Sequence, residues 1–354
     1  MVNTGTVSRA LHYEPSSLRY TGIVGTGGIG SGKFFQLDSN QTMGREESRS
    51  GLLLDVRDYC KQHIILHYMK ILLGPGFTVI PVGKVGNDET GNTLFREMED
   101  TGFKMDLVRK VPDLPTLFSF CFQYPDGSGG NMTTENSASA DVDPGFIREA
   151  AVEIKNLGMS GMILAAPEVP LSSRQTLLET GKENGLFCSA SFTTGEIGEV
   201  LDRSIISNVD LISINLDEAE AFAGIQPGER DPASSVESAI QVLLSQNEHI
   251  MVSVTGGKQG SWCWDGQRIN TVPPIETRVV STAGAGDAFF SGLLCGTSLG
   301  LHFFDAQRLA TLIAGMSVTS PHTIHHGIDR KSICRFMEGT DQLFPETIIN
   351  LLKD

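Results

Sequence analysis

The sequence STAGAGDAFFSG, residues 281–292, joins a turn of small residues directly to a predicted helix. Gly284 and Gly286 permit unusual backbone angles and the close approach of a ligand. The first N–H groups of a helix have no partner within the helix, so they can point at an anion. Asp287 falls in the first turn, where the helix dipole favours its carboxylate form by about 0.3–1 kcal/mol. The stretch therefore predicts an anion-binding turn beside a charged proton acceptor.

The rest of the chain has the rhythm of a parallel sheet covered by helices. From about residue 20 onward, short apolar runs alternate with amphipathic helical patterns. A length of 354 residues suits one large α/β domain, which we expect to span residues 1–354. Strands are predicted at 20–25, 77–82, 162–165, 186–191, 210–214 and 249–254, and helices at 92–101, 173–184, 216–223, 234–245 and 285–299.

One stretch, LFSFCFQY at residues 117–124, has the pattern of an exposed-edge antiparallel strand that runs into a hairpin turn at 125–127. Together with residues 34–38 it predicts a small β-sheet lid over the ends of the sheet strands, where ligands bind in open α/β folds. We expect the lid to come from parts of residues 31–48 and 108–131. An exposed sheet edge invites a second copy, so a homodimer through the lid is a candidate assembly.

The net charge limits which binding partners are expected, and the cysteines indicate the cellular compartment. With 27 basic and 42 acidic residues, the net charge of -15 disfavours nucleic acids and anionic membranes as partners. A small nucleotide can still be held by helix termini, backbone N–H groups and a divalent metal. The six cysteines are widely separated and form no C-x-x-C pair, which indicates buried thiols of a reducing compartment. The first twenty residues lack an apolar signal region, so we expect a cytoplasmic location.

Four segments, in the correct order, resemble the ribokinase-like (PfkB) carbohydrate kinase family. STAGAGDAFFSG is similar to the family signature D-T-x-G-A-G-D, and VGKVGNDETG at 82–91 resembles V-G-x-D-x-x-G. NLDE at 215–218 resembles N-x-x-E, and VTGGKQG at 254–260 resembles T-x-G-x-x-G. The resemblance covers roughly residues 20–330. It implies a ribokinase-like α/β fold, with a mostly parallel central sheet, helices on both faces and a small β-sheet lid.

The activity implied by the resemblance is transfer of the γ-phosphate of ATP to a hydroxyl of a sugar or sugar-like small molecule. Asp287 would be the catalytic base, and the turn at Gly284 with the amides of Ala285, Gly286 and Asp287 would form the anion hole. Mg²⁺ is the implied metal, held near Asn215 and by Glu218 through water. The residues implied at the nucleotide are Asn215, Glu218, Thr255, Gly257, Gly260, Thr282, Ala314 and Ser317.

Two of these assignments have a structural alternative. Asn215 and Glu218 also have the spacing of a capping box, in which the two side chains close the start of a helix. Ala314 and Ser317 are small residues on a predicted helix, where small side chains usually serve close packing. The functional and the structural interpretation both remain open for these four residues.

The chain departs from the family pattern on the substrate side and at one cation position. Ser281 stands where relatives carry an Asp that helps to form a monovalent-cation site, so activation by potassium is in doubt. Relatives place an Asp shortly after the first strand and a Gly-Gly pair followed by Asn in the next helix. Here the matching stretches are GTGGIGSGK at 25–33 and RDYCKQHIILHYMKILLG at 57–74. The acceptor therefore need not be a common sugar.

Several polar residues lie near the predicted acceptor pocket by their position in the sequence. Each has an equal claim to be a surface charge or a turn residue. As a group, their charges are consistent with an acidic or phosphorylated acceptor. The candidates are Arg45, Glu46, Arg49, Asp58, Lys61, Asn131 and Asn136.

Other motifs suggest rival activities. GTGGIG at 25–30 fits the dinucleotide fingerprint of an NAD-dependent dehydrogenase, but the following stretch has the pattern of strand and loop, not of the required helix. Residues 27–33 approximate a phosphate-binding P-loop, yet Phe34 stands where a metal-binding hydroxyl is needed. A catalytically weak sugar- or nucleotide-binding regulatory relative is a further alternative. The presence of Asp287, Asn215 and Glu218 favours activity.

A zinc site is a further alternative for one segment of the chain. Cys60, His63 and His67 have a spacing that places them on one helical face, as in some zinc sites. The sequence shows no evident fourth ligand, so a partly buried helix face explains the pattern equally well.

Overall fold

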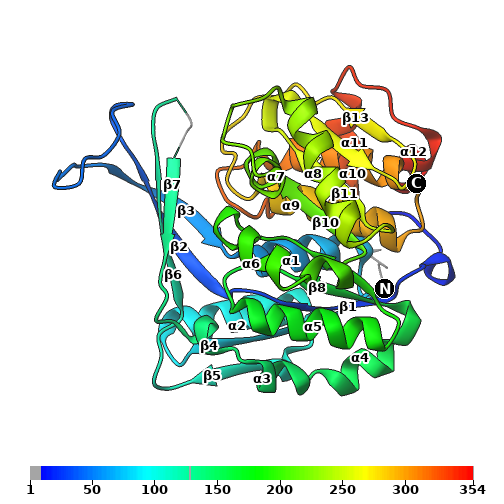
Figure 1. Ribbon diagram of the computed structural model, residues 1–354, viewed down its shortest axis with the longest axis horizontal. Coiled ribbons are helices and arrows are strands. Elements are labelled where there is room, and N and C mark those ends of the chain that lie inside the picture. Colours follow the sequence, from blue (N-terminus) through cyan, green and yellow to red (C-terminus); the bar gives the residue numbers. More distant parts are fainter. Residues whose placement is uncertain (1–8, 127–128, 354) are drawn as a thin grey trace, which may run out of the picture.

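A nine-stranded sheet forms the centre of the molecule in the computed structural model, which describes residues 9–126 and 129–353 (Figure 1). Its order is β13-β12-β11-β10-β9-β8-β1-β4-β5. The strands from β11 to β5 run parallel, and β12 and β13 are antiparallel additions at one edge. The predicted mostly parallel sheet is confirmed. Its strands are β1 (Gly22–Thr26), β4 (Thr78–Gly86), β5 (Val108–Val111), β8 (Gly161–Ala165), β9 (Phe187–Ala190), β10 (Leu211–Asn215), β11 (Met251–Thr255), β12 (Ser261–Trp264) and β13 (Ile269–Val272).

Helices cover both faces of this sheet, as predicted. Successive strand residues point to opposite faces, so Ile23 of β1 belongs to one hydrophobic core and its neighbour Val24 to the other. The Ile23 face packs against α1 (Lys61–Leu73), α2 (Glu89–Thr101), α9 (Ala285–Ser298), α10 (Phe303–Ser317), α11 (Arg330–Glu338) and α12 (Glu346–Leu352). The Val24 face packs against α3 (Pro144–Arg148), α4 (Ala151–Leu157), α5 (Leu171–Glu183), α6 (Ile197–Asp202), α7 (Leu216–Ala223) and α8 (Pro232–Gln246).

Every strand and helix expected from the sequence overlaps an observed element, with ends shifted by a few residues. Short 3-10 turns complete the connections. They are η1 (Pro15–Ser17), η2 (Met105–Leu107), η3 (Ala138–Asp141), η4 (Gly158–Ser160), η5 (Thr194–Glu196), η6 (Ile205–Asn208) and η7 (Gly257–Gln259).

A second sheet of four strands projects from one side of the core and forms the lid (Figure 1). Its order is β3 (Leu52–Tyr59), β2 (Gly30–Gln36), β6 (Leu117–Gln123) and β7 (Gly129–Thr133). The β6–β7 hairpin agrees with the predicted turn, of which Gly127 lies outside the described residues.

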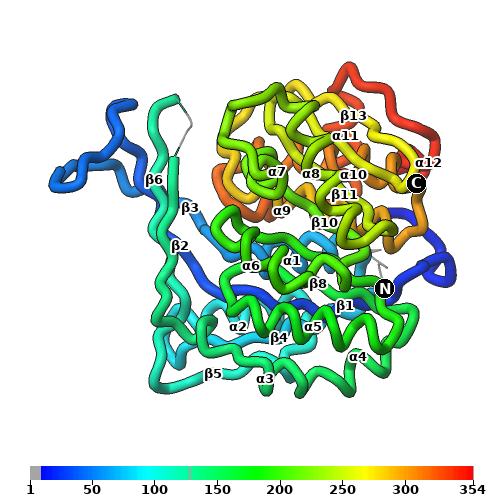
Figure 2. Tube along the Cα trace, in the orientation of Figure 1, coloured from blue at the N-terminus to red at the C-terminus, as the bar shows by residue number. Residues whose placement is uncertain are grey.

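The predicted edge position of β6 is wrong. β2 pairs with β6 in parallel on one side, and β7 pairs with it in antiparallel orientation on the other. The local pattern cannot reveal this, because β2 lies far away in the sequence. The boundaries of the lid also differ from expectation, since β3 joins the lid while β5 pairs with β4 at the edge of the central sheet. Between β2 and β3, residues 37–51 extend well beyond the core (Figure 2).

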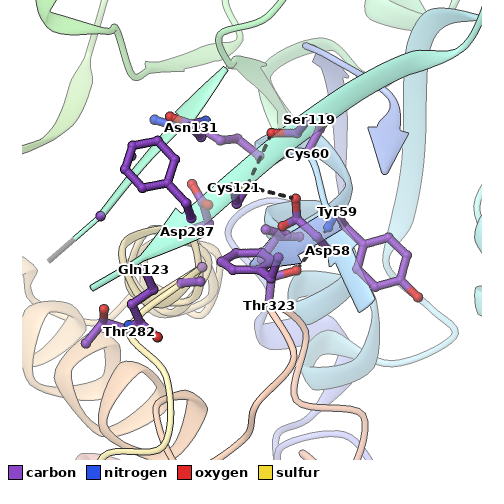
Figure 3. A pocket seen from close by; sticks show the side chains of 18 of the residues that line it. Asp58, Tyr59, Cys60, Ser119, Cys121, Gln123, Asn131, Thr282, Asp287 and Thr323 are labelled. Atoms are coloured by element: carbon purple, nitrogen blue, oxygen red, sulfur yellow. Dashed lines mark hydrogen bonds between the residues drawn. The ribbon is translucent and has the colours of Figure 1, made fainter. Parts of the chain in front are cut away.

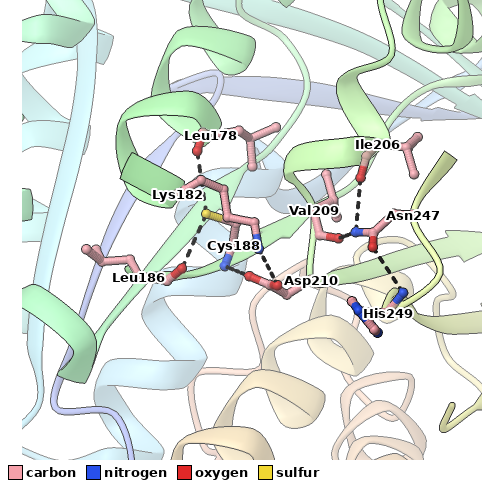
Figure 4. A network of polar contacts seen from close by, with 9 residues as sticks. All are labelled: Leu178, Lys182, Leu186, Cys188, Ile206, Val209, Asp210, Asn247 and His249. Atoms are coloured by element: carbon pink, nitrogen blue, oxygen red, sulfur yellow. Dashed lines mark hydrogen bonds and ion pairs between the residues drawn. The ribbon is translucent and has the colours of Figure 1, made fainter. Parts of the chain in front are cut away.

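Polar contacts secure the amino ends of β9, β10 and β11 (Figure 4). The Asp210 carboxylate, just before β10, accepts hydrogen bonds from the Cys188 N–H at 2.8 Å and from Lys182 Nζ at 2.5 Å. The Asn247 side chain donates to the carbonyls of Val209 and Ile206 at 2.7 and 3.4 Å. These contacts hold the strands in register at their amino ends and leave their carboxyl ends available for a site.

The two ends of the described chain lie close together (Figure 1). The Leu11 N–H donates to the Leu72 carbonyl, and the His12 N–H donates to the Leu351 carbonyl. All six cysteines are free thiols, and five of them are buried, as predicted. Within residues 9–126 and 129–353, no helix has both the length and the apolar character needed to cross a membrane.

Candidate active site

A cavity of about 320 Å³ opens where the lid meets the carboxyl ends of the central strands (Figure 3). Its walls come from all four lid strands, the start of α1, the loop after β8, the start of α9 and the loop after α10. Residues as distant in sequence as Phe34 and Thr323 therefore face the same space. The cavity lies where the sequence predicted a ligand site.

Asp287 is the third residue of α9 and lines this cavity. The residue before the helix, Gly284, has a φ of 77°, in the left-handed region. A side chain there would come within 2.5 Å of the Thr323 carbonyl oxygen, so both the backbone angle and the contact require glycine. The turn thus presents Asp287 to the cavity at the start of a helix.

The amides in this turn are only partly available to an anion. The Ala285 N–H already donates to the Thr282 carbonyl at 3.1 Å, so it is engaged in a turn. The amides of Gly286 and Asp287 occupy positions that lack partners within a helix, and α9 has no side-chain cap among the described residues. A side chain at Gly286 would meet nothing within 4 Å, so the surface at this residue is open.

Lys61, the first residue of α1, balances the acidic groups around it. Burial lowers the pKa of Lys61, but the charges of Asp287, Glu218 and Glu168 together raise it above its usual value. Burial raises the pKa of Asp287, and the nearby Lys61 ammonium lowers it. The two side chains therefore stabilise each other in their charged forms at the edge of the cavity.

Glu168 is a site residue that the sequence analysis missed. It follows β8 and lines the cavity, with a φ of 76° that is unusual for a residue other than glycine. Its Oε2 is buried without a hydrogen-bond partner among the described residues. Burial raises its pKa to about 7, against the opposing effect of Lys61. The available signal was a carboxylate in Pro-Glu-Val-Pro, directly after a buried strand.

The GTGGIG stretch makes room for this loop and does not open a dinucleotide site. A side chain at Gly28 would come within 2.5 Å of the Glu168 Cβ. The stretch leads from β1 into the lid strand β2, whereas a dinucleotide fingerprint requires a helix at that point. The glycines therefore serve close packing between the lid and the core.

The structure brings three of the predicted acceptor residues to the cavity: Asp58, Lys61 and Asn131. The other four do not line it. Arg45, Glu46 and Arg49 lie on the extended segment between β2 and β3, where Arg49 donates to Glu47, and Asn136 is exposed beyond β7. The segment between β2 and β3 projects away from the core, so Arg45, Glu46 and Arg49 lie away from the cavity, and the acceptor role of all four residues stays a prediction.

The predicted capping box is present at the start of α7. Asn215 Oδ1 accepts from the Glu218 N–H at 2.8 Å, and Glu218 Oε2 accepts from the Asn215 N–H at 2.9 Å. Burial raises the pKa of Glu218, and Lys61 lowers it. Glu218 therefore lies near the same charges as Asp287 while also capping a helix.

These residues fit a magnesium ion that keeps most of its water. In the described part of the chain, no three His, Cys, Asp or Glu side chains converge to hold a metal, so an all-protein cage is absent. Mg²⁺ commonly uses one or two carboxylates together with water and substrate phosphates. Glu218 supplies such a carboxylate. The same finding gives no support to a zinc site at Cys60, His63 and His67.

The predicted nucleotide residues lie outside the cavity, except for Thr282. Thr255 ends β11, and Gly257 and Gly260 form the turn to β12 with φ of 55° and 85°. A side chain at Gly260 would come within 2.3 Å of the Val272 carbonyl oxygen, so close packing explains why a glycine stands at this position. The nucleotide-binding role of these residues remains a prediction.

Ala314 and Ser317 both belong to α10. The Ser317 hydroxyl is buried and donates to the Ala314 carbonyl at 2.8 Å. Ala314 packs against the hydrophobic core. Close packing accounts for both residues, and their proposed place beside adenine rests on the resemblance alone.

Residues 71–329 match the family described as pfkB family carbohydrate kinase. A protein named uncharacterized sugar kinase, from Archaeoglobus fulgidus, is 25% identical over 254 residues, covering 69% of this chain and 92% of its own length. A ribokinase from Lactococcus lactis is 23% identical over 238 residues, covering 67% and 72% of the two chains. The crystal structure of a Cryptococcus neoformans ribokinase in complex with ADP matches with a TM-score of 0.73 and 18% identity, over 90% of this chain and 99% of the other. The fold is ribokinase-like.

Proposed function

The chain belongs to the pfkB family of carbohydrate kinases, and on that premise we propose that it transfers the γ-phosphate of ATP to a hydroxyl of a sugar or sugar-like molecule. The observation that carries this proposal is the position of Asp287, in the first turn of α9 and on the wall of the cavity. A carboxylate and two available amides in one turn combine a proton acceptor with an anion site.

In the proposed reaction, the acceptor occupies the cavity between lid and core, with the reacting hydroxyl next to Asp287. Asp287 accepts the hydroxyl proton as the acceptor oxygen attacks the γ-phosphorus and the bond to the β-phosphate breaks. The Gly286 and Asp287 amides donate hydrogen bonds to the oxygens of the transferring phosphate. Lys61 adds a positive charge at the same edge.

The nucleotide would lie on the far side of Asp287, along the carboxyl ends of β10 and β11. Asn215 and Glu218 would hold Mg²⁺ through water, and the metal, when bound, would neutralise part of the phosphate charge. Thr255 and the turn at Gly257 and Gly260 would contact the nucleotide. The exposed Thr282 connects this side with the cavity.

The composition of the cavity wall favours a neutral polyhydroxy acceptor. Asp58, Glu168 and Asp287 supply three carboxylates, and Lys61 is the only Lys or Arg among the described residues of the wall. Carboxylates accept hydrogen bonds from hydroxyls, whereas they repel a second anion. We therefore propose an uncharged acceptor, in place of the acidic or phosphorylated acceptor that the sequence suggested.

A panel of phosphate acceptors tests the function. Purified protein with Mg-ATP would be assayed for ADP release with D-ribose, 2-deoxy-D-ribose, D-fructose, inosine, glycerol and fructose 6-phosphate. We expect acceptor-dependent ADP release with at least one uncharged compound and a phosphorylated product by mass spectrometry. Binding of acceptor without any transfer would support the regulatory alternative instead.

We also propose that two copies associate through the lid. Apolar side chains are exposed on its strands, with Leu53 58% and Met132 64% exposed on one face and Leu52 70% exposed on the other. An apolar sheet that projects from the core favours a partner, and a second identical lid supplies a matching surface.

A further inference from the structure

Gly32 leaves a gap in the middle of the lid that a neighbouring carboxylate enters. Gly32 of β2 lies opposite Asp58 of β3 on one side and opposite Ser119 of β6 on the other. A side chain at Gly32 would come within 2.0 Å of Asp58 Oδ2 and 3.0 Å of the Ser119 carbonyl oxygen. The Asp58 side chain therefore crosses over β2, where any residue larger than glycine would displace it.

The crossing brings Asp58 into the cavity beside β6 (Figure 3). Its Oδ2 accepts a hydrogen bond from the Cys121 thiol at 3.6 Å, and Cys121 Sγ lies 3.4 Å from Ser119 Oγ. Asp58 is only 8% exposed although it lies on a strand whose preceding residues are mostly exposed. Its direction is thus inward, toward the space that Asp287 also faces.

The donors around this carboxylate are few for a buried charge. Among the described residues, the Cys121 thiol donates a hydrogen bond to it, and the nearby Tyr59 main-chain N–H is engaged with Thr323 Oγ1. A carboxylate can accept about four hydrogen bonds, and a thiol is a weak donor. Burial raises the pKa of Asp58 to about 6, with a further contribution from the charge of Asp287. Hydroxyl donors in the cavity would complete its hydrogen bonding.

We propose that Asp58 is the acceptor-recognition residue of the lid, where its carboxylate accepts a hydrogen bond from a hydroxyl other than the one that is phosphorylated. Gly32 provides the gap that lets it reach the cavity. This inference rests on the proposed kinase function and deepens it. Asp58 on the lid and Asp287 on the core would each accept a hydrogen bond from a different hydroxyl of one neutral polyhydroxy compound. The acceptor must therefore carry at least two hydroxyl groups.

A purely structural role for Asp58 makes a different prediction. If the carboxylate only joined β3 to β6 through the Cys121 thiol, its replacement would lower lid stability and leave acceptor affinity unaffected once the protein is folded. The Asp58→Asn variant keeps the shape and an accepting oxygen while it removes the charge. The Gly32→Ala variant keeps the carboxylate and changes its position.

The experiment compares Asp58→Asn, Gly32→Ala and the double variant in the full chain. It uses the acceptor with the highest kcat/KM for the wild-type enzyme. We expect the acceptor KM to rise at least tenfold in each single variant, because Asp58→Asn leaves only a neutral oxygen to accept the hydroxyl hydrogen bond and Gly32→Ala displaces the carboxylate. The Mg-ATP KM should stay within twofold. The acceptor KM of the double variant should not exceed the higher of the two single-variant values, since both changes act on one interaction.

Matched controls separate recognition from general damage. Asp55→Asn changes an exposed carboxylate on the same strand, and Gly76→Ala adds a methyl where nothing lies within 4 Å. Both should keep the wild-type acceptor KM. Thermal unfolding checks that each variant is folded, and Asp58→Ser provides a second substitution should Asp58→Asn not fold.

The inference and the proposed function fail in different ways. Wild-type transfer together with an unchanged acceptor KM in folded Asp58→Asn overturns the inference and leaves the kinase function standing. No transfer by the wild-type protein to any panel compound overturns the function. Calorimetric titration of the acceptor with the highest kcat/KM, in the absence of ATP, gives a comparison that needs no turnover. Weaker binding by Asp58→Asn than by the wild type supports the inference, and equal affinities overturn it.

Discussion

Asp287 lies in two settings at once, the first turn of α9 and the wall of the cavity. An aspartate in the first turn of a helix is stabilised by the helix dipole wherever it occurs. In this chain burial raises the pKa of Asp287, and the charge of Lys61 opposes that rise. The same residue lines the cavity, so its carboxylate lies both at the helix start and on the cavity wall.

Replacement of Asp287 by Asn should abolish most of the activity. The amide cannot accept the hydroxyl proton, so we expect kcat to fall by about 10²- to 10⁴-fold, the usual contribution of general-base catalysis. The Mg-ATP KM should change by far less. Steady-state assays of ADP release would measure both values. Asp305→Asn, in the first turn of α10, is the matched control and should keep kcat. Near-normal turnover of Asp287→Asn would refute the proposed base.

Glu168 should make stability depend on pH in a characteristic direction. Its folded-state pKa is about 7, raised chiefly by burial from 4.5. Its contribution to stability is therefore fully present below pH 4.5 and is lost as the pH rises through 7. Glu168→Gln resembles the protonated form, so it should melt at a higher temperature than the wild type at pH 8, and the difference should shrink toward pH 5. Calorimetry of the ligand-free proteins measures this, and a constant difference across the range would contradict it.

At the scale of elements, α1 and the loop after α10 form one unit beside the site. Lys61 starts α1, and His67 on the same helix lies against His326 of the loop, with His63 packed beside His67. His322 Nδ1 accepts from the Arg57 N–H at 3.1 Å, and Thr323 Oγ1 accepts from the Tyr59 N–H at 3.0 Å. The loop thereby ties the lid strand β3 to the core.

This histidine cluster should make the protein sensitive to acid. Burial is the main reason that the pKa of His63 and of His67 falls to about 3 from 6.5. Their contribution to stability is complete above pH 6.5 and is lost as the pH falls toward 3. We expect His63→Gln to reduce the difference in unfolding free energy between pH 7.5 and pH 5.5, measured by urea denaturation. The exposed His249→Gln is the control and should leave that difference unchanged.

At the scale of the whole molecule, the lid and the core form the site jointly. The four-stranded sheet supplies Asp58 and Asn131, and the nine-stranded sheet with its helices supplies Lys61, Glu168 and Asp287. Neither part alone encloses an acceptor. A second copy bound to the outer lid would hold these strands in place over the core.

The lid association predicts a change of mass on a single substitution. Leu53→Lys places a charge on an exposed apolar position of β3, so we expect it to shift a dimer toward the monomer. Light scattering during size-exclusion chromatography measures the mass. Met159→Lys, at an 82% exposed position outside the lid, should leave the mass unchanged. A wild-type monomer at all concentrations would contradict the proposed assembly.

The central sheet and the start of α9 were predictable because their signals are local. Buried parallel strands appear as short apolar runs, and a glycine-rich turn before a helix identifies its own anion site. The β3 strand was not predictable in the same way. Its LLLDVRDY pattern is largely exposed and gains its pairing only from β2, across residues 37–51.

The amino-acid sequence by itself determined the α/β architecture and the family and singled out Asp287, since each of these rests on spacing within short segments. Only the tertiary structure decided which polar residues line the cavity. Glu168 and Asp58 reach the cavity through the gaps at Gly28 and Gly32, while Arg45 is carried away on the segment between β2 and β3. Such convergence depends on how distant strands pair, and that information is spread over the whole chain.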